Sequence, residues 1–147
     1  MNINEVEIHV RFNEMDEMGI VHNSVYYIWF EIARYNFAMK ALGIQYQDLK
    51  DMGVLVPVIH SECQYKIPAR YPDILKVSCF LEPTEKAMLI LHYRIVRLNT
   101  NELIAVGKTM NVFTDMNGRL RLTLPDFVRS AIKKTESDSE LLMRIKG

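Results

Sequence analysis

The sequence lacks the features that mark several common protein classes. It has two cysteines in 147 residues, Cys63 and Cys79, and neither belongs to a Cys-x-x-Cys pair. A disulfide scaffold or a redox motif is therefore not indicated, and because both lie in strand-like segments we expect buried free thiols. The histidines are not spaced as metal ligands, so no metal is expected; those without a role are His9, His60 and His92.

Charge and hydropathy exclude further classes. The formal net charge is zero, and no long run of Lys or Arg occurs, so neither nucleic acid nor an anionic membrane is expected as a partner. No apolar run reaches the length of a membrane span, because Glu31 and Arg34 interrupt the most apolar segment. The first residues have neither the basic nor the apolar stretch of a secretion signal, so a cytoplasmic location is expected.

Several catalytic motifs are also missing. The sequence contains no Gly-x-Ser-x-Gly elbow, no Gly-x-x-x-x-Gly-Lys phosphate loop and no dinucleotide fingerprint. What it has instead is a hydrophobic fraction of 49%, enough at this length for one folded domain with its own core. We expect that domain over residues 1–134, followed by a C-terminal tail over residues 135–147.

The pattern of apolar residues predicts an α+β domain. Residues 5–12 alternate as a half-buried strand does. Asn23 or Ser24 then offers an N-cap for a helix that runs to about Leu42 and ends at Gly43. This helix is apolar on nearly every side, so other elements are expected to wrap it.

The second half of the chain is mostly strand-like. Asn117-Gly118 indicates a type I′ hairpin turn, Pro125 opens a short helix, and the polar segment 135–140 is expected to be loose. These features predict one long central helix wrapped by a curved antiparallel sheet of five to six strands. The other expected elements are a short helix at 45–52 and strands at 59–67, 75–81, 89–95 and 103–113.

The most informative segment is residues 16–34. Asp16 precedes Gly19 by three residues, and the polar cluster His22-Asn23-Ser24 follows at the start of the long helix. A helix start presents unpaired N–H groups and partial positive charge, which can hold a developing oxyanion. A carboxylate that faces such a helix end is suited to acyl transfer.

This segment resembles the signature of a known family. The pattern Asp16-x-x-Gly19-x-Val21-x-Asn23-x-x-Tyr26-x-x-x-x-Glu31-x-Ala33-Arg34 is similar to that of the hotdog-fold acyl-CoA thioesterases. Within that family it most resembles the 4-hydroxybenzoyl-CoA thioesterase-like branch and the acyl-CoA thioesterase encoded with the Tol–Pal envelope system. Tyr65-x-x-Pro68-Ala69-Arg70-Tyr71-x-Asp73 and the segment from Gly107 to Asp115 agree with it as well, so the likeness spans residues 6–132.

The resemblance implies a hotdog fold and hydrolysis of an acyl-CoA, with no metal and no other cofactor. It also implies a homodimer, or a homotetramer built as a dimer of dimers, with the active site between subunits. By resemblance, Asp16 attacks the thioester carbonyl directly or activates a water, and the backbone N–H of Asn23, joined by that of Ser24, polarises the carbonyl. Without the resemblance, Asp16 would be read as a loop carboxylate that caps the helix.

Three further positions carry open alternatives. Gly19 lets the loop pass close to the substrate or adopts a positive φ. His22 departs from relatives that have histidine one place later, so it is a catalytic candidate or a structural partner. Glu31 aligns with the working carboxylate of another hotdog branch, but it lies three residues before Arg34 and is expected to pair with it.

Substrate contacts follow from the chemistry of coenzyme A. Its phosphates bind basic side chains, and the candidates are Lys66, Arg70 and Lys86. The alternative for each of them is an ordinary charged residue on the surface. The acyl group should meet apolar side chains such as Tyr26, Trp29 or Phe30, although most of these belong to the core.

Two rival functions remain. The first is a hotdog hydroxyacyl dehydratase that uses His22 with Asp16 or Glu31. The second is a non-catalytic hotdog scaffold that binds an acyl chain or a partner protein. The dehydratase needs His22, whereas the scaffold tolerates the loss of Asp16.

Overall fold

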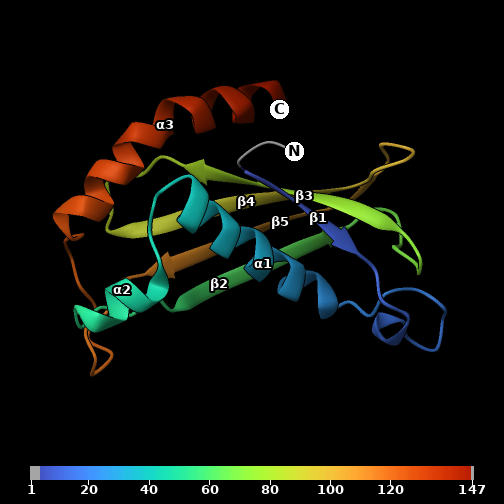
Figure 1. Ribbon diagram of the computed structural model, residues 1–147, viewed down its shortest axis with the longest axis horizontal. Coiled ribbons are helices and arrows are strands. Elements are labelled where there is room, and N and C mark those ends of the chain that lie inside the picture. Colours follow the sequence, from blue (N-terminus) through green and yellow to red (C-terminus); the bar gives the residue numbers. More distant parts are fainter. Residues whose placement is uncertain (1–3, 147) are drawn as a thin grey trace.

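A five-stranded antiparallel sheet curves around one long helix, α1 (Figure 1). The computed structural model describes residues 4–146, and side chains as far as Glu136. The strands lie in the order β1-β3-β4-β5-β2. The expected α+β architecture is therefore confirmed, with five strands. The elements are β1 (Glu5–His9), a 3-10 turn (Phe12–Glu14), α1 (Val25–Lys40), α2 (Tyr46–Asp51), β2 (Val58–Tyr65), β3 (Ile74–Glu82), β4 (Met88–Arg97), β5 (Leu103–Val112) and α3 (Asp126–Lys146).

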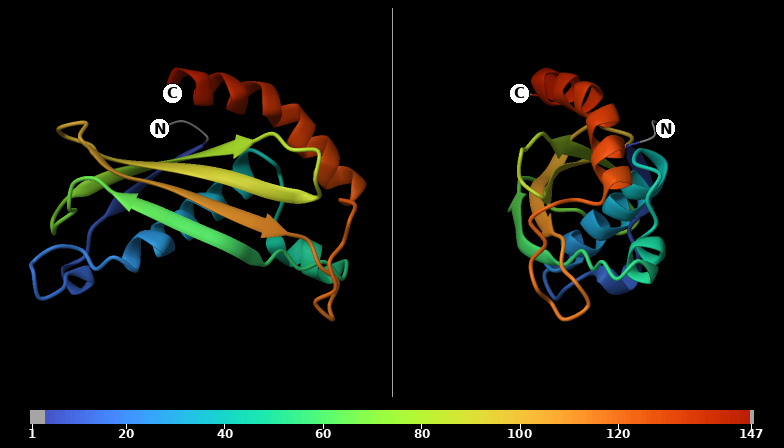
Figure 2. Two further views of the ribbon diagram at one scale, coloured as in Figure 1. Left: turned by 180° about the vertical axis from the view of Figure 1, so that it is seen from behind. Right: turned by 90° about the vertical axis from the view of Figure 1, so that its left-hand side faces the viewer.

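Helix α1 packs against the concave face of the sheet, as the end-on view in Figure 2 shows. The residues that it buries recur at helical spacing and include Tyr26, Trp29, Phe30, Ala33 and Phe37. Its opposite face is open, because Ile28, Ile32 and Met39 are 55%, 43% and 52% exposed. The expectation that other elements wrap this helix therefore holds for one face only.

Phe30 brings the middle of α1 against the sheet. Its ring stacks on that of Tyr93 in β4, with the centroids 4.5 Å apart and the planes 23° from parallel. The tip of the same ring occupies the place of a side chain at Gly107 in β5, since a Cβ there would lie 2.3 Å from Phe30 Cζ. Gly107 thus provides the close approach that seats the helix.

Several local expectations are corrected. Strand β1 ends at His9, because the Arg11 N–H donates to Glu14 Oε1 at 2.7 Å and the chain turns there. Asn117 has no positive φ, so its turn is not type I′. The Asp115 carboxylate instead accepts hydrogen bonds from the N–H groups of Asn117 and Arg119 and supports a wider loop.

Helix α3 is longer than the sequence indicated. It continues through Lys146, so the segment 135–140, which we expected to be loose, is helical. No proline or glycine follows Pro125 before Gly147 to end it. No helix in the described part of the chain combines the length and apolar composition that crossing a membrane requires.

Replacing Gly107 with alanine tests how α1 is seated. The added Cβ has to displace Phe30, and overpacking of this kind costs about 1–3 kcal/mol, which lowers Tm by roughly 2–4 °C for each kcal/mol. Thermal unfolding measures the loss. The double variant Gly107→Ala/Phe30→Leu should lose less than the sum of the two single variants, and strict additivity would contradict this contact.

Candidate active site

A tight loop after β1 holds Asp16. The Asp16 N–H donates to the Ile20 carbonyl at 2.8 Å, and Asp16 Oδ1 accepts a hydrogen bond from the Met18 N–H at 2.8 Å. Gly19 closes this turn at a φ of +74°, and a Cβ on it would meet no atom within 4 Å. Of the two roles left open for Gly19, the geometry therefore favours the positive φ.

Asp16 and Asn23 line one cavity of about 250 Å³ at the start of α1. Tyr26 and Lys66, both predicted from the sequence as substrate contacts, line it too. The remaining lining residues are Met18, Ile20, Val21, Tyr65, Ile67 and Pro68. The structure thus joins a carboxylate, a helix start and a basic side chain around a mostly apolar space.

Asn23 lines this cavity, and its backbone N–H is not engaged by the described residues. Among the described residues, none accepts a hydrogen bond from the Asn23 N–H. The Ser24 N–H, in contrast, already donates to His22 Nδ1 at 3.2 Å. Of the two donors suggested by sequence, Asn23 is the one left to meet a ligand.

Tyr65 is a site residue to which sequence reasoning gave no role. Its hydroxyl donates to the Asn23 carbonyl at 2.9 Å, and its ring meets that of Tyr26 edge to face at 4.8 Å. It therefore ties the end of β2 to the start of α1. The available signal was its place at the head of the Tyr65-x-x-Pro68 motif.

His22 lies outside this cavity. Its Nδ1 is 2.8 Å from Ser24 Oγ, and both residues line a separate groove with Phe12 and Tyr71. The geometry thus fits His22 as a structural partner of the helix start, the alternative to a catalytic role.

Glu31 and Arg34 do not form the expected ion pair. Arg34 is 7% exposed and donates to the Tyr93 hydroxyl at 3.3 Å, and within the described residues it has no carboxylate within ion-pair distance. Glu31 is exposed and lines a second cavity, away from Asp16. Both side chains line this second cavity, but they form no ion pair, because Arg34 is buried against Tyr93 whereas Glu31 stays exposed.

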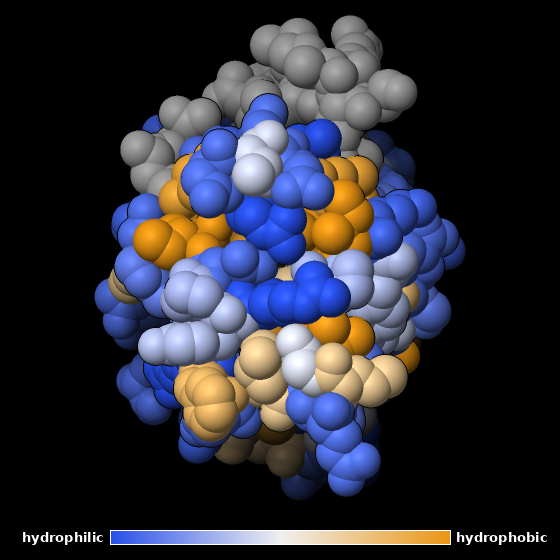
Figure 3. All heavy atoms as spheres, turned by 90° about the vertical axis from the view of Figure 1, so that its right-hand side faces the viewer, coloured by the Kyte–Doolittle hydropathy of each residue, from blue (hydrophilic) through white to orange (hydrophobic). Residues whose placement is uncertain are grey.

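The three basic candidates are spread along the molecule. Lys66 lines the cavity and Arg70 follows Pro68 in the adjoining loop, whereas Lys86 lies by α3 at the opposite end of the sheet (Figure 1). Figure 3 shows the end of the molecule that carries the loops before α1 and before β3. This end is largely hydrophilic, with smaller hydrophobic patches in between.

The cysteines are free, as expected, with Cys79 buried and Cys63 partly buried. Burial raises the pKa of the Cys63 thiol to about 11, so the thiol keeps its proton at neutral pH and is a poor nucleophile. No three potential metal-ligating side chains of the described residues come together as a site.

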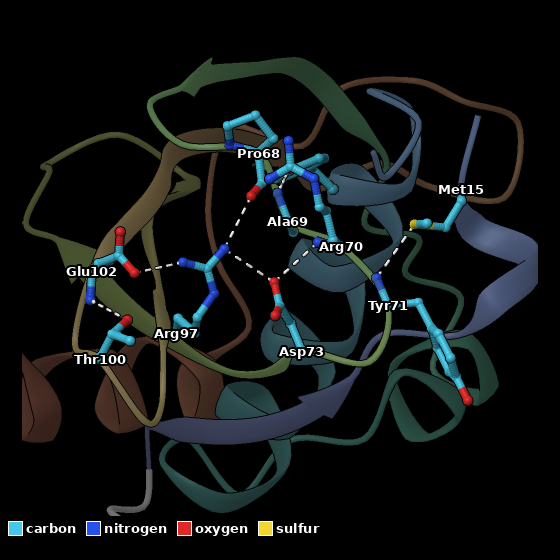
Figure 4. Close-up of polar contacts among 10 residues, drawn as sticks. Met15, Pro68, Ala69, Arg70, Tyr71, Asp73, Arg97, Thr100 and Glu102 are labelled. Carbon is cyan, nitrogen blue, oxygen red and sulfur yellow. Dashed lines mark hydrogen bonds and ion pairs between the residues drawn. The ribbon is translucent and has the colours of Figure 1, made fainter. Parts of the chain in front are cut away.

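Arg97 holds the loop that supports the Asp16 turn (Figure 4). Its guanidinium contacts Asp73 Oδ2 at 3.1 Å, Glu102 Oε1 at 2.6 Å and the Pro68 carbonyl at 3.1 Å. Hydrogen bonds from Thr100 and Arg97 lower the pKa of the Glu102 carboxyl. One side chain thus fastens both ends of the segment 68–73.

The fastened segment in turn holds the loop that carries Asp16. The Ala69 carbonyl accepts a hydrogen bond from the Val21 N–H at 2.9 Å, and the Ala69 N–H donates to the Tyr26 hydroxyl at 3.3 Å. The Tyr71 N–H contacts Met15 Sδ at 3.3 Å. Sequence reasoning missed Arg97, because two of its three partners, Pro68 and Asp73, come from a distant part of the chain.

Removing the Arg97 guanidinium should make the loop around Asp16 more mobile. We expect Arg97→Gln to speed hydrogen exchange at the Val21 amide roughly tenfold, since about 1–2 kcal/mol of local support is lost. Arg94→Gln, on the same strand, is the control and should leave that amide unchanged. Equal exchange in all three proteins would refute the support role of Arg97.

Comparisons with known proteins agree with this geometry. Residues 10–132 match the family model described as the thioesterase-like superfamily. The "Putative acyl-CoA thioesterase YneP" of Bacillus subtilis is 35% identical over 95 residues, which cover 65% of this chain and 68% of that protein. A "Putative esterase" of Aquifex aeolicus is 32% identical over 84% of this chain and 93% of its own length.

Solved structures show the same fold. The DHNA-CoA thioesterase from Staphylococcus aureus superposes with a TM-score of 0.82 and 27% sequence identity, and the match covers 90% of each chain. The resemblance noted from the Asp16–Arg34 signature is thereby confirmed. The chain belongs to the thioesterase-like superfamily of hotdog proteins.

Proposed function

We propose that this protein hydrolyses an acyl-CoA to the free acid and CoA, with Asp16 as the reacting carboxylate and the Asn23 N–H as the oxyanion donor. One observation carries the proposal: Asp16 lines the same cavity as Asn23, whose N–H has no acceptor among the described residues. The names of its relatives, an acyl-CoA thioesterase and a DHNA-CoA thioesterase, support the substrate class.

The cavity accommodates either of two routes for the same reaction. In the first, an Asp16 oxygen attacks the thioester carbon, CoA leaves as a thiolate, and water then cleaves the resulting anhydride. In the second, Asp16 takes a proton from water, the hydroxide attacks, and the proton passes to the departing sulfur. In both, the Asn23 N–H stabilises the tetrahedral oxyanion, a contact of a kind typically worth about 3–4 kcal/mol.

Basic side chains near the cavity suit the phosphates of CoA. Lys66 lines the cavity, and Arg70 lies in the next loop, so both are proposed as contacts. Lys86 is at the far end of the same sheet, so within one chain it does not reach this cavity. It is a candidate only where a second copy lies alongside.

We further propose that two copies join through β2. Among the described strands, β2 pairs only with β5, and its other edge is open. Val58, Ile59 and Tyr65 on this strand are 43%, 58% and 46% exposed. Edge-to-edge pairing satisfies the free N–H and C=O groups and covers these side chains. The pairing of two such dimers into a tetramer and the cytoplasmic location remain predictions.

Loss of the Asp16 carboxylate should abolish turnover. We expect Asp16→Asn and Asp16→Ala to reduce release of free thiol from acyl-CoA by at least 10³-fold, in line with the loss of a reacting group, while Tm barely changes. A panel of aliphatic, benzoyl and phenylacetyl thioesters supplies the assay. Undiminished turnover in either variant would eliminate this role for Asp16.

The same panel separates the rival functions. A hydroxyacyl dehydratase would need the His22 imidazole, whereas the proposed thioesterase keeps most of its activity in His22→Gln. A non-catalytic scaffold would release no thiol from any substrate and would be indifferent to Asp16→Ala. The position of His22 in a separate groove favours the thioesterase over the dehydratase.

A charge placed on the open edge tests the proposed dimer. We expect Ile59→Asp to shift the protein from dimer to monomer in analytical ultracentrifugation, since pairing through this edge would bury a carboxylate without a partner. Leu122→Asp, at a residue that is 81% exposed in the loop before α3, is the control and should remain dimeric. A dimer unaffected by the Ile59 change would place the interface elsewhere.

A further inference from the structure

The two peptide groups that flank Asn23 are held by different contacts. The His22 carbonyl shares a peptide group with the Asn23 N–H, and it accepts a hydrogen bond from the Val25 N–H at 3.0 Å. The Asn23 carbonyl belongs to the next peptide group, and it accepts a hydrogen bond from the Tyr65 hydroxyl at 2.9 Å. The N–H of that second group, on Ser24, donates to His22 Nδ1 at 3.2 Å. Both peptide planes are therefore fixed, while the Asn23 N–H has no acceptor among the described residues.

The Tyr65 hydroxyl takes the place of a backbone donor. Ser24 has the dihedral angles of an α-helix, with φ at −69° and ψ at −24°. If the regular hydrogen-bond pattern of α1 began there, the Asn23 carbonyl would accept from the Tyr27 N–H, four residues further on. The Tyr27 N–H instead donates to the Ser24 carbonyl at 3.3 Å, in the tighter pattern that is frequent at helix ends. Two donors thus suit the Asn23 carbonyl, and in this structure it is bound by Tyr65.

Tyr65 is itself held in place and has its proton engaged. Its ring packs edge to face on Tyr26 with the centroids 4.8 Å apart, and Tyr26 belongs to the core. Desolvation raises the pKa of the Tyr65 hydroxyl above its ordinary value, so the hydroxyl keeps its proton at neutral pH. That single proton is donated to the Asn23 carbonyl. Tyr65 therefore lines the cavity of Asp16 without offering a donor to a substrate.

We infer that Tyr65 is a positioning residue for the oxyanion donor, and that it sets the direction of the Asn23 N–H by holding the adjoining carbonyl. This inference rests on the proposed function and adds a residue to the same site. The residues before α1 are attached to the helix through the peptide group between Asn23 and Ser24, so rotation of that group also turns the Asn23 N–H. Without the hydroxyl, the Asn23 carbonyl is free to turn toward the Tyr27 N–H. Donors that stabilise an oxyanion have to be in place before the reaction, because their reorganisation adds to the barrier.

Loss of the hydroxyl should therefore lower kcat rather than raise KM. We expect Tyr65→Phe to reduce kcat about tenfold for the best thioester of the panel, a loss typical of one hydrogen bond, while KM changes by less than about twofold. The reason is that the oxyanion forms only in the transition state. Because phenylalanine keeps the ring that packs on Tyr26, the variant should fold, with a Tm close to that of the unaltered protein.

A spectroscopic measurement reports on the donor without turnover. In the Asp16→Asn protein, benzoyl-CoA with an isotope-labelled carbonyl should stay intact, and infrared difference spectroscopy gives the carbonyl stretching frequency of the bound thioester. Addition of Tyr65→Phe should raise this frequency, because a misdirected Asn23 N–H polarises the carbonyl less, while Kd changes little. A tyrosine with a purely structural role would leave the frequency unchanged.

Tyr71→Phe is the matched control. It removes a tyrosine hydroxyl from the loop before β3, where the residue is 50% exposed and lies outside the cavity of Asp16. Its kcat, KM and bound carbonyl frequency should equal those of the unaltered protein. Analytical ultracentrifugation of both tyrosine variants checks that neither change alters the oligomeric state.

The inference and the proposed function fail in different ways. Thiol release that Asp16→Asn abolishes but Tyr65→Phe leaves at full kcat overturns the inference alone. A Tyr65→Phe protein that loses affinity at constant kcat also overturns it, because Tyr65 would then touch the substrate directly. A loss of kcat without any change in carbonyl frequency indicates a general structural effect and overturns it too. No thiol release by the unaltered protein from any thioester refutes the proposed function and, with it, the inference.

Discussion

The contact of Phe30 with Gly107 and Tyr93 is the constraint on which the rest of the structure depends. It sets how deeply α1 enters the curve of the sheet. With Phe30 fixed in this way, the start of α1 lies at the cavity of Asp16. One turn after Phe30, Arg34 donates a hydrogen bond to the Tyr93 hydroxyl. The packing of α1 in the core therefore also determines the geometry of the site, because this one helix bounds both cavities.

The carboxylate of Asp16 is supported through a series of contacts. Asp16 is held by a turn, the turn is held by Ala69, and the loop that carries Ala69 is held by Arg97. Each contact uses backbone groups or a fixed guanidinium fork, which keep a geometry better than flexible side chains do. Asn23 is positioned likewise, through the Tyr65 hydroxyl.

The sequence foretold local features well and distant ones poorly. Alternation and capping signals located α1, α2 and all five strands, because those signals lie within the elements themselves. Of the candidates in the Asp16–Arg34 signature, Asp16, Asn23 and Tyr26 line the first cavity, whereas Glu31 does not. Arg97 escaped notice, since its importance depends on Asp73 and Pro68, which only folding brings near. The Glu31–Arg34 pair failed for a related reason: spacing on a helix cannot tell which of two neighbours the sheet will bury.

Main-chain hydrogen bonds close the turn that carries Asp16, from Asp16 to Ile20 and from His22 to Glu14, and a third joins Val21 to Ala69 in the neighbouring loop. The side chains at positions 17, 18 and 20 take no part in those closures. Two of them, Met18 and Ile20, line the same cavity as Asp16. Substitutions at these positions, in evolution or by design, can therefore reshape the mouth of the cavity while Asp16 keeps its position. A few such substitutions are enough to make new substrates accessible.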